Sequence, residues 1–93
     1  MTVIPFKAQT IKGKVTDEKN APLTYANVVL QTVDSIYVAG TTTDLEGRFE
    51  LALHEKAKLI NISFVGYSTI TKEISQYDLG IIQLSPDTQL NNA

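Results

Sequence analysis

The chain of 93 residues has no cysteine, no tryptophan and a single histidine. Without cysteine there is no disulfide framework, no thiol nucleophile and no zinc site built on thiolates. His54 alone can neither build a metal site nor complete a hydrolytic triad. It stands in a polar corner beside Glu55, so we predict an exposed loop residue. We therefore expect no catalytic residue, no metal ligand and no cofactor.

The sequence also has no large excess of charge of either sign and no long apolar run. The formal net charge is −2, and the seven lysines and Arg48 are scattered, which argues against a nucleic-acid partner. No apolar run approaches the ~20 residues of a membrane helix. Asp44 and Glu46 lack the spacing of a calcium loop, and no serine stands in a Gly-x-Ser-x-Gly frame. With 43% hydrophobic residues, the chain can form one domain with a modest core.

What the sequence does contain is alternation of apolar and polar residues, which predicts strands. Gly13 and Gly40 within these strands mark a bulge or a close approach of backbones. The expected strands are 11–16, 25–32, 36–43, 48–53, 58–65, 68–74 and 79–84. Their expected inward residues are Ile11, Val15, Ala26, Val28, Leu30, Phe49, Leu51, Leu53, Ile60, Ile62 and Phe64. Turns every ~8–12 residues predict an all-β fold, a single seven-stranded Greek-key sandwich.

One stretch, residues 41–51, organises this pattern. Thr41, Thr42 and Thr43 suit a pleated strand, Asp44 can start a turn, and Gly47 can adopt the positive φ that closes it. We predict a β-hairpin here, with Asp44 and Gly47 as its structural turn. The three threonines are also our candidate partner edge, at which another strand could add to the sheet.

Four motifs in order carry a resemblance to a known family. They are Ile11-x-Gly13-x-Val15-x-Asp17, Pro22-Leu23-x-x-Ala26-x-Val28-x-Leu30, Thr42-Thr43-Asp44-x-x-Gly47-x-Phe49-x-Leu51 and Ile62-Ser63-Phe64-Val65-Gly66-Tyr67. Together they resemble the carboxypeptidase-regulatory-like domain, a transthyretin-like seven-stranded sandwich. That domain is found at the N-terminus of many TonB-dependent outer-membrane receptors and related β-barrel proteins of the Bacteroidetes. The resemblance implies no catalytic residues and hence no enzyme, because the family's name is a structural label.

The resemblance also implies a setting. It predicts a non-catalytic spacer or protein-docking domain on the periplasmic side of the outer membrane. Its partners would be the plug and β-barrel downstream in the same chain and other envelope proteins; alone, the domain would be a monomer or a weak oligomer. Residues 1–10 would be a tail or a signal-peptide remnant, 11–86 the sandwich, and 87–93 a linker toward a further domain.

Two alternatives come from other classes of protein. Tyr25, Tyr37, Tyr67 and Tyr77 could stack on sugars, in a carbohydrate-binding or adhesive cell-surface module, or could simply edge a small core. A Lys–Asn isopeptide bond, as in surface adhesins, would join Lys12 or Lys14 to Asn27 or Asn61. Both lysines fall on the outward face of their strand, whereas such a bond needs a buried site.

Overall fold

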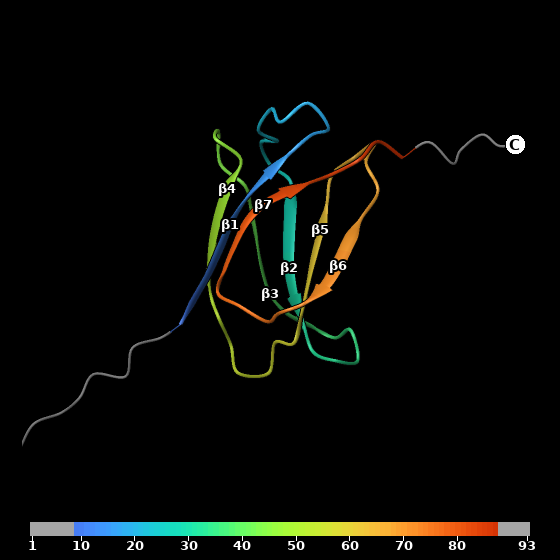
Figure 1. The fold of residues 1–93 in the computed structure, drawn as a ribbon. Coiled ribbons are helices and arrows are strands. Elements are labelled where there is room, and N and C mark those ends of the chain that lie inside the picture. Colours follow the sequence, from blue (N-terminus) through green and yellow to red (C-terminus); the bar gives the residue numbers. More distant parts are fainter. Residues whose placement is uncertain (1–8, 88–93) are drawn as a thin grey trace, which may run out of the picture.

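The structure is a computed structural model and describes residues 9–87. Seven strands form two facing sheets and the described residues contain no helix (Figure 1). The strands are β1 (Thr10–Thr16), β2 (Asn27–Gln31), β3 (Tyr37–Thr42), β4 (Arg48–Ala52), β5 (Leu59–Ser63), β6 (Ile70–Glu73) and β7 (Asp78–Gln83). One sheet has the order β4-β1-β7 and the other β3-β2-β5-β6. The predicted all-β, seven-stranded sandwich is confirmed.

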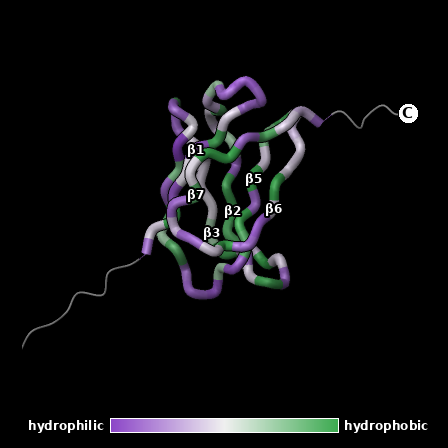
Figure 2. Tube along the Cα trace, in the orientation of Figure 1, coloured by the Kyte–Doolittle hydropathy of each residue, from purple (hydrophilic) through white to green (hydrophobic). Residues whose placement is uncertain are grey.

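The core lies between the sheets, where the inward residues of paired strands stand opposite one another. In the larger sheet, Val28 pairs with Ile62 and Leu30 with Ile60, and all four are fully buried. The smaller sheet contributes Ile11, Val15, Phe49 and Ile82 to the same cluster. Figure 2 shows hydrophobic residues along β2, a central strand of the larger sheet, which contributes Val28 and Leu30 to the core.

The first and last strands run in the same direction. β1 pairs with β7 in parallel, from Lys12 opposite Asp78 to Thr16 opposite Gln83, with a register shift between Lys12 and Lys14. Gly13 lies at this irregularity, where the sequence predicted a bulge or a close approach of backbones. β1 also pairs antiparallel with β4, so this is a mixed sheet with β1 at its centre.

The β-hairpin predicted over residues 41–51 is wrong. β3 pairs with β2, whereas β4 pairs with β1 in the other sheet, so residues 43–47 form a corner between the sheets. The period-2 pattern finds strands and their faces but carries no information on which strand is the partner. Phe49 of β4 belongs to the core cluster in the smaller sheet, and Val38 of β3 packs against that cluster from the larger sheet, so the two strands close one core from opposite sides.

Some predicted boundaries and faces also differ from the structure. The strand expected at 25–32 begins at Asn27, because Tyr25 has a positive φ of 66°. Phe64 follows the end of β5 and is only partly buried, with its ring 5.8 Å from that of Tyr67. Leu51 and Leu53 are likewise half-buried. The segments 1–8 and 88–93, which contain most of the expected tail and linker, lie outside the described residues.

Candidate interaction surfaces

The corner between β3 and β4 is folded by the side chain of Asp44. Its Oδ1 accepts hydrogen bonds from the backbone amides of Glu46 and Arg48, both at 2.9 Å. These bonds favour the charged carboxylate and lower the pKa of Asp44 from its usual value. The Gly47 amide donates to the Asp44 carbonyl at 2.9 Å, and Gly47 has a φ of 77°. The two residues predicted to turn the chain therefore do so, in a corner rather than in a hairpin.

The corner is fixed to the rest of the molecule by Thr43. This residue is 1% exposed, and its hydroxyl donates to the Leu23 carbonyl and accepts from the Ala26 amide at 2.8 Å. Both partners belong to the segment that leads into β2. Thr43 is therefore an interior residue, and of the three candidate edge threonines only Thr41 and Thr42 lie on β3.

β3 forms one outer edge of the larger sheet. Thr42 is exposed and Thr41 half-buried, and each has a partner in β2 on one side only. The edge continues through Gly40 and Ala39, which were not predicted to belong to it. The sequence does contain a sign that the edge is longer than the three threonines, because residues 36–43 have no charged side chain.

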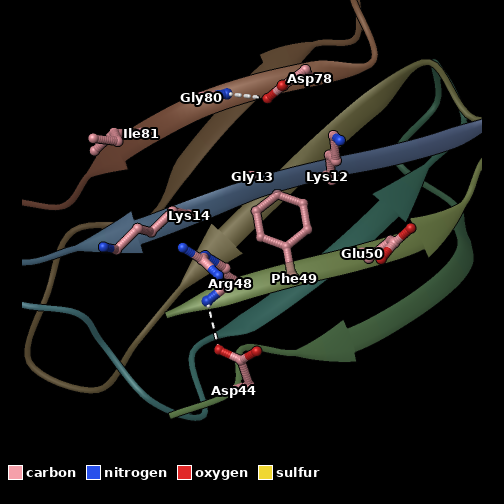
Figure 3. Close-up of a pocket in the computed structure, with 10 residues that line it drawn as sticks. All are labelled: Lys12, Gly13, Lys14, Asp44, Arg48, Phe49, Glu50, Asp78, Gly80 and Ile81. Carbon is pink, nitrogen blue, oxygen red and sulfur yellow. Dashed lines mark hydrogen bonds between the residues drawn. The ribbon is translucent and has the colours of Figure 1, made fainter. Parts of the chain in front are cut away.

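A second surface is a hollow of about 530 Å³ on the smaller sheet (Figure 3). Two of the residues that line it are glycines, Gly13 of β1 and Gly80 of β7. Cations and carboxylates line it in equal number: Lys12, Lys14, Arg48, Asp44, Glu50 and Asp78. With charges of both signs the hollow favours neither an anion nor a cation. Among the described residues, no three histidine, aspartate or glutamate side chains are grouped as a metal would require.

The remaining candidates do not gather into a site. Tyr25 precedes β2 at the end where Asn27 pairs with Thr42, whereas Tyr37 pairs with Gln31 at the opposite end. Tyr67 packs on Phe64, and Tyr77 lies beside β1 in the smaller sheet, where its carbonyl accepts a hydrogen bond from the Lys12 amide. The four tyrosines therefore do not gather into one stacking surface. Burial raises the pKa of Tyr67, and the neighbouring carboxylate of Glu18 raises it further.

His54 and the residues considered for an isopeptide bond also have ordinary surroundings. His54 is exposed, and its Nδ1 accepts a hydrogen bond from the Lys56 amide at 3.2 Å. Asn61 belongs to β5 in the larger sheet and donates to the Thr71 hydroxyl at 2.8 Å, whereas Lys12 is exposed on the smaller sheet. The described residues contain no helix of the length and apolarity that a membrane crossing requires.

Comparison with known proteins identifies the domain. The family model of the CarboxypepD_reg-like domain matches residues 11–93. A 3-chlorocatechol 1,2-dioxygenase from Rhodococcus opacus 1CP is similar in structure, with a TM-score of 0.60 and 13% identity over 87% of this chain and 60% of that one. A 9R-lipoxygenase from Cyanothece PCC8801 is similar with a TM-score of 0.51 and 15% identity.

That likeness covers 89% of this chain but 18% of the lipoxygenase. The chain thus spans less than two thirds of either enzyme, and at these identities the likeness concerns the fold alone. No curated protein matches the chain.

Proposed function

Because the chain belongs to the CarboxypepD_reg-like domain family, we propose that it is an accessory domain of a TonB-dependent outer-membrane receptor or a related β-barrel protein. The domain of this family is a non-catalytic β-sandwich module. The proposed setting is the periplasmic side of the outer membrane, ahead of a plug and barrel. It is supported by the four ordered motifs through which the sequence resembles domains in that position.

The parallel pairing of β1 with β7 is the observation that supports a spacer role. Parallel first and last strands make the chain enter the sandwich at one end and leave it at the other (Figure 1). Six or seven residues of strand span about 20 Å at ~3.3 Å per residue. A domain inserted in this way separates the segments on either side of it, whereas antiparallel terminal strands would bring them together.

The same domain can dock a protein through the open edge of β3. An incoming extended segment would bond to the backbone of β3 and lengthen the larger sheet by one strand. Thr41 and Thr42 lie on this edge, and the exposed side chain of Thr42 would contact the incoming strand.

Fractionation of cells that produce this domain tests the setting. An antibody raised against the domain should detect a band much larger than 10.2 kDa in the outer-membrane fraction. A band near 10.2 kDa in a soluble fraction would contradict the receptor proposal and favour a domain that acts alone.

A pull-down from envelope extract tests docking at β3. Wild type and Thr42→Val should recover the same envelope protein, because valine keeps the backbone amide and suits a strand. Thr42→Pro removes that amide and should lose the partner. Equal recovery by all three proteins, or recovery of nothing by any, would argue against docking and leave the spacer role.

A further inference from the structure

The four strands at the edges of the two sheets differ in how well they resist pairing with another strand. Proteins protect such edges with charged residues, proline or bulges. β4 carries Arg48 and Glu50, β6 carries Lys72 and Glu73, and β7 begins with Asp78. β3 has no charged residue and no proline, and neither do the residues that flank it at 36 and 43. Within residues 9–87, β3 is therefore the edge that lacks protection by charge.

The backbone groups that this edge offers follow from the hydrogen bonds at its end. The Thr43 amide donates to the Ala26 carbonyl, which lies on the side of β2. Because amides in an antiparallel strand alternate between the two sides, Thr41 also faces β2, whereas Gly40 and Thr42 face the open edge. A register shift opposite Leu30 and Gln31 interrupts the ladder beyond Ala39. The regular open edge is therefore the segment 39–42.

We propose that β3 is a self-association edge, at which β3 of a second copy of this chain pairs antiparallel to form a two-fold symmetric dimer. The two four-stranded sheets would then become one continuous sheet. A two-fold axis makes each residue of the edge meet the same short segment of its partner. Where a charged residue lies near that axis, the pairing brings two like charges together, which lowers the stability of the dimer. Segment 36–43 has no charged side chain, so no like charges meet in the dimer. The net charge of −2 causes little long-range repulsion between the two copies.

Exposed apolar residues at both ends of β3 favour the same arrangement. Tyr37 begins the strand and is 65% exposed, while Leu45 lies beyond its end and is 77% exposed. Antiparallel pairing brings the start of one strand to the end of the other, so the end of β3 that carries Tyr37 lies toward the corner of the partner that carries Leu45. These contacts would bury apolar surface that the single chain leaves in water.

This inference goes beyond the proposed function, because it assigns the open edge of β3 to a second copy of this chain and not to another envelope protein. The cellular setting and the dimer are tested separately, since the dimer needs only the purified 93-residue chain. Failure of the fractionation experiment would leave the dimer standing, and a monomeric chain would leave the receptor setting standing.

Sedimentation equilibrium over a range of concentrations is the first test. Wild type should pass from 10.2 kDa toward twice that mass as its concentration rises. Thr42→Lys places two added charges close together in the dimer and should raise the dissociation constant about tenfold or more. Thr71→Lys adds the same charge to β6, the other edge of the same sheet, and should leave the dissociation constant unchanged.

Amide hydrogen exchange locates the interface. At high protein concentration the amides of Gly40 and Thr42 should exchange about tenfold or more slowly than in dilute solution, whereas that of Thr41 should not change. Circular dichroism melts of dilute samples establish that both lysine variants are folded. A chain that stays monomeric at every concentration, equal dissociation constants for the two lysine variants, or slowed exchange at β6 instead of β3 would each overturn the proposal.

Discussion

Gly13 of β1 lies directly opposite Phe49 of β4, and the ring of Phe49 fills the space that a side chain at position 13 would need. A Cβ atom placed on Gly13 would be 2.9 Å from Cζ of Phe49 and 3.0 Å from Cε2. Phe49 is only 4% exposed and belongs to the core. Figure 3 shows its ring beside Gly13. The glycine thus lets the largest side chain of the smaller sheet lie flat against the central strand.

Gly13→Ala should therefore destabilise the domain by about 1–3 kcal/mol, the usual cost of overpacking a well-filled core. The backbone of Gly13 does not adopt a positive φ, so the added methyl group causes no backbone strain. Its nearest neighbours are the ring of Phe49 and, at 3.2 Å, the carbonyl oxygen of Gly80. In a urea titration, Phe49→Leu should suppress most of that cost when combined with Gly13→Ala. Additive effects of the two substitutions would show that the ring is not the obstacle.

Truncation of Phe49 and of Phe64 should have unequal effects, although the alternating pattern of the sequence places both on inward faces. Phe49→Ala should cost about 3–5 kcal/mol, as for a large buried side chain. Phe64→Ala should cost roughly half as much, because its ring is partly in solvent and packs on Tyr67 at the rim. Chemical denaturation of both variants measures the difference. Equal losses would mean that Phe64 is a core residue after all.

Substitution of Gly47 in the corner should lower the stability of the domain much more than substitution of Gly66 in an open loop. Gly47→Ala combines a positive φ with a Cβ only 2.5 Å from the Val15 carbonyl oxygen, so we expect a loss of about 3 kcal/mol or more. Gly66→Ala is the matched control, since its φ of 86° is also positive but its Cβ would have no atom within 4 Å. It should cost about 1–2 kcal/mol. A similar cost for both would show that backbone strain alone matters.

Two buried threonines should respond to valine in opposite ways. Thr43→Val leaves the Ala26 amide and the Leu23 carbonyl without their shared partner, and we expect a loss of about 1–3 kcal/mol. The Thr16 hydroxyl is buried with no hydrogen-bond partner, so Thr16→Val should be neutral or stabilise by up to about 1 kcal/mol. Thermal melts of the two variants would reveal the opposite signs; a stabilising Thr43→Val would contradict the role of the bridge.

Acid should weaken the corner through Asp44. Its pKa in the folded chain lies below the ordinary value near 3.8, chiefly because the Arg48 amide and then the Glu46 amide donate to the carboxylate. The stabilisation is therefore present above pH 4 and is lost as the pH falls through the folded pKa.

Asp44→Asn supplies the control for this pH effect. It keeps an acceptor oxygen but cannot titrate, so between pH 5 and pH 2 its stability should fall less than that of wild type. Melting temperatures of the two proteins across that range provide the measurement. Parallel decreases would place the acid sensitivity in other carboxylates.

Much of the candidate edge was accessible from the sequence. The uncharged threonine-rich run predicted an edge at Thr41–Thr43, and two of these residues do lie on an edge strand. Thr43 was misjudged because burial of a hydroxyl depends on acceptors and donors elsewhere in the chain. Leu23 and Ala26 lie 20 and 17 residues away, and no local pattern predicts that they meet Thr43.

The sequence by itself determined the number of strands, their approximate bounds, most of their inward faces and the turn at Asp44 and Gly47. These properties depend on side-chain period and on local backbone preference, which act over a few residues. Only the tertiary structure decided that β3 and β4 part into different sheets, that Gly13 makes room for Phe49, and that β7 runs parallel to β1. These relations join residues far apart in the chain, and they are set by which apolar faces together enclose one core.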